Sequence, residues 1–124
     1  MVGVRDLTSS RDARAALADL DYVYFPYRPD VMHWFCKPSP ARRTHHLHLV
    51  PVSSPLWAER LAFRDYLRNS TEARIEYAAL KVSLAERFPF DREAYTEAKG
   101  AFIERIVVRA LGQRPQAEVA TPSA

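Results

Sequence analysis

Cysteine, glycine and long apolar runs are scarce in this sequence of 124 residues. The single cysteine, Cys36, excludes a disulfide framework within the chain and is typical of a reducing compartment, so we expect a cytoplasmic location. The three glycines are scattered and form no glycine-rich phosphate loop. No apolar run approaches the roughly 20 residues of a membrane span, and the N-terminus lacks the apolar core of a signal peptide. We therefore expect no membrane association.

A dominant charge of one sign is also missing. The sequence contains 18 basic and 15 acidic residues, for a net charge of +3, and the two kinds are interleaved. A nucleic-acid-binding domain of this size usually carries a denser basic stripe. The charge hints at an anionic partner and gives no support to nucleic-acid binding.

The order of the expected elements predicts an α+β fold, with a small mixed or antiparallel sheet and helices packed on it. Alternation and β-branched or aromatic residues predict strands at 2–4, 21–25, 31–37 and 42–51. Helical spacing and capping residues predict helices at 8–20, 55–69, 70–88 and 91–112. The last three strands should form an antiparallel meander. We expect one domain over 1–112 and a disordered tail over 113–124, which is small, polar and proline-bearing.

Three of the four histidines lie in the strand expected at 42–51. Because side chains alternate along a strand, His46 and His48 share one face and His45 lies on the other. Such a pair can be purely structural, can contact a ligand, or can bind a metal if His33 on the neighbouring strand supplies a third imidazole. The sequence leaves these three interpretations open.

The helix expected at 55–69 carries an arginine ridge, because Arg60, Arg64 and Arg68 recur every four residues. Guanidinium groups bind phosphate or carboxylate in a bidentate way, so the ridge suits an anionic ligand. The alternative is a solvated helix face with local ion pairs, for which Asp65 is the available partner.

Two lysines lie among apolar neighbours on the last two helices. Lys81 follows Tyr77 by four residues, and Lys99 follows Tyr95 by four, so each lysine shares a helix face with a tyrosine. Each lysine could reach water along the core surface or extend into a cleft.

Four segments together resemble the GrpB family: His46–Val50, Phe63–Arg68, Glu76–Lys81 and Tyr95–Lys99. The resemblance extends over nearly the whole chain, to about Leu111. It implies a nucleotidyltransferase-like fold, in which helices flank a mixed sheet. It also implies a nucleotide or another phosphorylated small molecule as the ligand.

The start of the chain departs from the family pattern. Members carry an upstream Gly-Ser segment for a nucleotide phosphate and a strand with an acidic residue for a divalent metal. Here Met1–Val4 looks like the end of that acidic strand, so we expect a truncated domain. Nucleotidyl transfer needs clustered carboxylates that hold magnesium. Magnesium is therefore expected only if carboxylates are supplied elsewhere, and whether the chain is an enzyme stays open.

The resemblance and the residue chemistry together suggest which side chains line the remaining pocket. We expect substrate contacts from the following residues: His46, Arg64, Arg68, Lys81 and Lys99. His48 is the best candidate for a general base, because an imidazole titrates near neutral pH.

Two alternatives to small-molecule binding remain. The short first strand leaves a sheet edge that a partner protein or a second copy could complete. A metal-dependent enzyme would instead use His33, His46 and His48.

Overall fold

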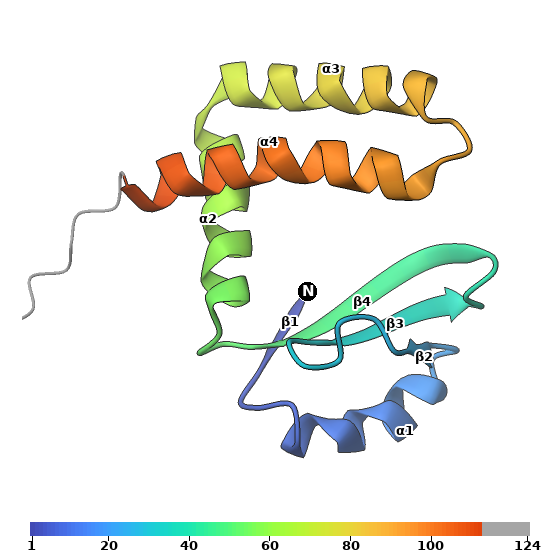
Figure 1. Ribbon diagram of the computed structural model, residues 1–124. Helices are drawn as coiled ribbons and strands as arrows, with labels where there is room; N and C mark the ends of the chain where they lie inside the picture. Colours follow the sequence, from blue (N-terminus) through green and yellow to red (C-terminus); the bar gives the residue numbers. More distant parts are fainter. Residues whose placement is uncertain (113–124) are drawn as a thin grey trace, which may run out of the picture. The chain divides into compact units, whose positions relative to one another are not determined.

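Strands come first and the long helices follow, so the structure confirms the α+β prediction (Figure 1). The computed structural model describes residues 1–112. The chain divides into two compact units, Met1–Ala58 and a second that begins at Glu59, with the boundary inside helix α2 (Pro55–Asn69). The tail that we expected to be disordered, 113–124, lies outside the described residues.

The first unit contains a four-stranded mixed sheet with the strand order β1-β4-β3-β2. Its strands are β1 (Val2–Val4), β2 (Val23–Phe25), β3 (His33–Pro38) and β4 (Arg43–Pro51). β1 pairs with β4 in parallel, whereas β2 with β3 and β3 with β4 pair in the antiparallel sense. The predicted meander is therefore confirmed, and β1 lies at one edge of the sheet.

The helix expected at 8–20 is shorter than predicted. A 3₁₀ turn, η1 (Ser9–Asp12), comes first, and the α-helix α1 covers only Ala13–Ala18. The carboxylate of Asp6, rather than the Thr8 side chain, accepts a hydrogen bond from the Ser9 N–H at 2.7 Å. The helix ends early because Asp21 adopts a left-handed conformation with φ 65°.

The pairing of β3 with β4 sorts side chains onto two faces of the sheet. Trp34 pairs with His48 and Cys36 with His46, so these four residues share one face, which we call the histidine face. His33 pairs with Leu49 and Phe35 with Leu47, so these residues lie on the other face, which we call the helix face. Cys36 is a free thiol, and it is buried.

The second unit contains the rest of α2 together with α3 (Thr71–Arg87) and α4 (Arg92–Gly112), which lie side by side (Figure 1). Both α3 and α4 are capped by a side chain, because Ser70 Oγ accepts a hydrogen bond from the Ala73 N–H and Asp91 Oδ1 accepts one from the Ala94 N–H. Phe102 and Ile106 form the buried core with Ala73. None of the helices within 1–112 has the length and apolar character that crossing a bilayer demands.

Gly3 and Gly100 form a matched pair for a stability test. A Cβ atom at Gly3 would lie 2.6 Å from Val52 Cγ1 and 2.9 Å from Trp57 Cη2, whereas a Cβ at Gly100 on α4 meets nothing within 4 Å. We expect Gly3→Ala to lower the free energy of unfolding by about 1–3 kcal/mol through overpacking. Gly100→Ala should raise it by about 0.5–1 kcal/mol, since alanine favours the helix. Urea unfolding followed by circular dichroism measures both, and equal effects would contradict the packing of β1.

Candidate functional site

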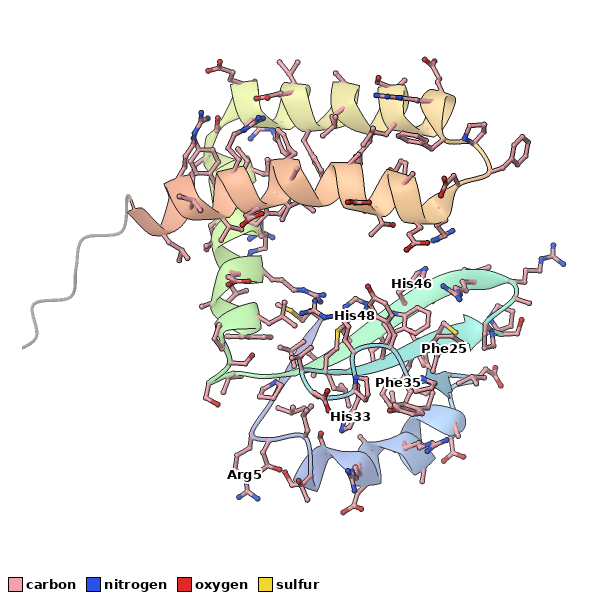
Figure 2. The ribbon with its side chains drawn as sticks, viewed as in Figure 1. Arg5, Phe25, His33, Phe35, His46 and His48 are labelled. Carbon is pink, nitrogen blue, oxygen red and sulfur yellow. The ribbon has the colours of Figure 1, made fainter. Side chains whose placement is uncertain are left out.

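The histidine face gathers aromatic and cationic side chains around Trp34. The ring centroid of Trp34 lies 5.4 Å from that of His46 and 6.4 Å from that of His48. The Arg43 guanidinium lies over Trp34, 4.8 Å from the ring centroid, and over Phe25 at 5.4 Å. Figure 2 shows His46 and His48 on the same side of the sheet. The predicted pairing of the two imidazoles on one face is therefore confirmed.

Arg43 belongs to this cluster because of a β-bulge. Lys37 pairs with His45, but Pro38 pairs with Arg43, so Thr44 is skipped in the register. Strict alternation from His46 would place Arg43 on the helix face, together with His45. The extra residue of the bulge reverses that assignment. Sequence reasoning missed Arg43 for this reason, although the adjacent prolines, Pro38 and Pro40, signal an irregular strand end.

The Arg43 guanidinium and the His46 ring on the histidine face are accessible to a ligand. Arg43 is exposed, and its Nε donates a hydrogen bond to the Pro40 carbonyl oxygen at 2.6 Å, which fixes the guanidinium plane. Within residues 1–112, Arg43 makes no ion pair with a carboxylate. His46 is exposed and His48 is half-buried. A guanidinium that is in no ion pair with a carboxylate can use its remaining N–H groups to bind a phosphate oxygen.

The metal site built from His33, His46 and His48 is not assembled. The register places His33 opposite Leu49, on the helix face, whereas His46 and His48 lie on the histidine face. On the helix face, the Nε2 atom of His33 lies 2.7 Å from the Leu7 carbonyl oxygen. Among residues 1–112, no three His, Cys, Asp or Glu side chains gather closely enough to hold a metal ion.

In the second unit, the arginine ridge is partly neutralised. Arg64 Nη2 lies 2.8 Å from the Asp65 carboxylate, in an ion pair whose two side chains are about half exposed. Arg68 is exposed, and its carbonyl oxygen accepts a hydrogen bond from the Arg74 guanidinium. Exposed pairs of this kind contribute little to stability. The local ion pair that the sequence left open is present at Arg64.

Lys81 and Lys99 each lie over the tyrosine four residues earlier in the chain. The Lys81 ammonium is 4.7 Å from the Tyr77 ring centroid, and the Lys99 ammonium is 5.3 Å from the Tyr95 ring centroid. The pKa of Lys99 is lowered by burial first, then by the positive charges of Lys81 and Arg92. Lys81 and Lys99 are therefore near enough to repel each other.

Lys99 also lines a cavity of about 450 Å³ beside the turn between α3 and α4. The aromatic walls of this cavity include Phe88 and Tyr95, and Arg92 adds a second positive charge. The predicted substrate residues thus fall into separate groups. His46 and His48 lie in the first unit, whereas Arg64, Arg68, Lys81 and Lys99 lie in the second. Their roles as substrate contacts, and that of His48 as a general base, stay predictions.

A family model and several known proteins are similar to this chain. A family model described as GrpB protein matches residues 1–109. A UPF0157 protein of Pseudomonas aeruginosa is 40% identical over 102 residues, which cover 78% of this chain and 41% of the relative. A UPF0157 protein of Deinococcus radiodurans is 38% identical over 110 residues, which cover 89% of this chain and 56% of the relative. This chain spans about half the length of these two relatives.

A solved structure shares the fold. The crystal structure of the conserved protein GrpB from Enterococcus faecalis matches with a TM-score of 0.73 and 29% sequence identity. The match covers 89% of this chain and 66% of that one.

The repulsion between Lys81 and Lys99 can be measured directly. We expect Lys81→Gln to raise the pKa of Lys99 toward its ordinary value, because one of the neighbouring positive charges is removed while burial remains. Nitrogen-detected NMR of the lysine ammonium groups across an alkaline pH series reports that pKa. The matched control is Arg109→Gln, which removes an exposed positive charge near the end of α4, the helix that carries Lys99. A pKa of Lys99 that is the same in both variants would contradict the arrangement of α3 and α4.

Proposed function

Because the chain belongs to the GrpB family, we propose that it binds a nucleotide or another phosphorylated small molecule on the histidine face of its sheet. The proposal includes a relationship to the nucleotidyltransferase superfamily and a cytoplasmic location, where a buried free thiol such as Cys36 persists.

The grouping of Arg43, His46 and His48 around Trp34 is the observation that supports this proposal. The guanidinium stacks on the indole and keeps its Nη N–H groups for a ligand, because Nε is already committed to Pro40. Imidazoles beside it add hydrogen-bond donors, and a positive charge when they are protonated. One phosphate group can contact such a set through two or three of its oxygens.

Binding, rather than group transfer, is what the histidine face supports by itself. The positions of β2, β3 and β4 that share this face carry no carboxylate: Val23, Phe25, Trp34, Cys36, Pro38, Arg43, His46, His48 and Val50. A magnesium ion that bridges two phosphates takes carboxylate ligands. Such ligands would have to come from outside β2, β3 and β4. If a hydroxyl group is activated here, His48 is the general base.

Titration with ATP by isothermal calorimetry, with and without magnesium, tests the site. We expect Arg43→Ala to weaken binding by about tenfold or more, because a charge-assisted hydrogen bond is lost. His46→Ala should weaken it by a smaller factor, because an imidazole offers fewer N–H donors to a phosphate than the permanently charged guanidinium of Arg43.

The neighbouring residues provide matched controls. Arg42 is exposed beside Arg43, and His45 is exposed but alternates to the other face from His46. Arg42→Ala and His45→Ala should bind ATP as the unmodified chain does. The proposal is wrong if all four variants lose affinity equally, or if the folded chain binds neither ATP nor inorganic phosphate.

A second candidate function rests on the position of β1. This three-residue strand lies at the edge of the sheet, and Val2 in it is 46% exposed. An exposed edge can accept a further strand from a partner protein or from a second copy of the chain. For the second copy, light scattering coupled to size exclusion should give a dimer mass that Val2→Lys reduces to a monomer mass. A monomer at high protein concentration would exclude pairing between copies.

A further inference from the structure

A second group of polar side chains lies on the opposite side of the sheet, beneath η1 and α1. A cavity of about 460 Å³ is present there, and its lining includes Ser10, Arg11, Arg14, Tyr24, His33 and Phe35. Figure 2 shows His33 and Phe35 on the side of the sheet that faces α1, away from His46 and His48. We call this space the helix-face cavity. It takes no part in the function proposed above.

His33 is the polar group for which the fold provides no second partner. Only 8% of the residue is exposed, and its Nδ1 atom is buried with no hydrogen-bond partner among residues 1–112. Its Nε2 atom lies 2.7 Å from the Leu7 carbonyl oxygen, which can only accept, so Nε2 carries a hydrogen. In the neutral ring Nδ1 is then a lone-pair acceptor. A buried acceptor without a donor is costly, so a group that donates to it is favoured.

The hydroxyl oxygen of Ser10 can also accept a hydrogen bond from a group in the cavity. Ser10 is buried, and its hydroxyl donates to the Leu7 carbonyl oxygen at 3.1 Å. Its hydrogen is therefore committed, and what it offers to the cavity is its oxygen lone pairs. The inner part of the cavity thus presents two acceptors.

The outer part of the cavity is cationic. The Arg14 guanidinium lies over the Tyr24 ring, 4.6 Å from its centroid, which holds the side chain against the cavity wall. Arg11 lies three residues earlier, on η1, and is exposed. In the part of the chain that the structure describes, neither arginine forms an ion pair with a carboxylate. Two guanidinium groups at one opening suit an anion.

We propose that the helix-face cavity binds a small organic anion that carries a hydroxyl group close to its charged end. The anionic group contacts Arg11 and Arg14, and the hydroxyl group donates a hydrogen bond to Nδ1 of His33. The carbon skeleton lies against Phe35 and the Tyr24 ring. A bare anion satisfies the arginines but leaves Nδ1 without a donor. The hydroxyl group therefore determines specificity.

Two phosphate monoesters separate these contributions. Glycerol 3-phosphate carries hydroxyl groups near its phosphate, whereas methyl phosphate has the same anionic group and none. In calorimetric titrations of the intact chain, glycerol 3-phosphate should bind more tightly than methyl phosphate by about five- to tenfold. Equal affinities of the two esters would overturn the role of His33.

His33→Gln tests the Nδ1 contact alone. The glutamine amide can still donate to the Leu7 carbonyl oxygen but offers no acceptor at the position of Nδ1. The two esters should therefore bind His33→Gln with equal affinity. Arg14→Ala, at an exposed position, should weaken both esters by about tenfold and keep the ratio between them. Arg14→Ala keeps the test valid if His33→Gln does not fold.

Two further variants show which face holds the ester. Arg5 lies outside the cavity lining and pairs with Asp6 at 3.2 Å, so Arg5→Ala should leave both affinities unchanged. Repeating the titrations in Arg43→Ala removes the phosphate contact proposed for the histidine face, and the preference for glycerol 3-phosphate over methyl phosphate should persist in that variant. Binding that is lost in Arg43→Ala but kept in Arg14→Ala would overturn this proposal and locate the phosphate on the histidine face. Binding of neither ester at millimolar concentration would overturn it as well.

Discussion

The antiparallel pairing of β3 with β4 is the constraint on which both candidate sites depend. The register sets Trp34 opposite His48 and His33 opposite Leu49, so it decides which imidazoles share a face. A slip by one residue would exchange the faces, because strand side chains alternate with a period of two. Burial of Trp34, Phe35 and Val50 opposes such a slip, since each would have to exchange its environment. The paired strands β3 and β4 thus carry Arg43 and Trp34 on one face and the unpaired Nδ1 acceptor of His33 on the other, within residues 1–112.

Local features of the fold could be predicted from the sequence, and features that depend on register could not. Ser70 and Asp91 were recognisable as helix caps because a cap acts over three residues. The shared face of His46 and His48 follows from alternation within one strand. The face of His33 depends on how β3 aligns with β4, which alternation within either strand leaves undetermined. Arg43 was missed because a β-bulge shifts it across the sheet.

In the second unit, the charged residues singled out in the sequence make contacts within their own helices. Arg64 pairs with Asp65, and Lys81 and Lys99 lie over Tyr77 and Tyr95. These contacts are within or beside a single helix turn, which is why their spacing is visible in the sequence. Burial, and then the positive charges of Lys81 and Arg92, lower the pKa of Lys99. A negatively charged ligand beside it would raise that pKa and relieve the repulsion.

The central claim is that the two faces of the sheet bind different ligands independently. Long-range proton–nitrogen NMR spectra of the histidine rings test it most directly, because each ring reports on its own face. Addition of ATP should move the resonances of His46 and His48 and leave those of His33 in place. Glycerol 3-phosphate should move the resonances of His33 in a chain that also carries Arg43→Ala. If either ligand moves the rings of both faces together, or moves none of them, the claim of two independent faces is wrong.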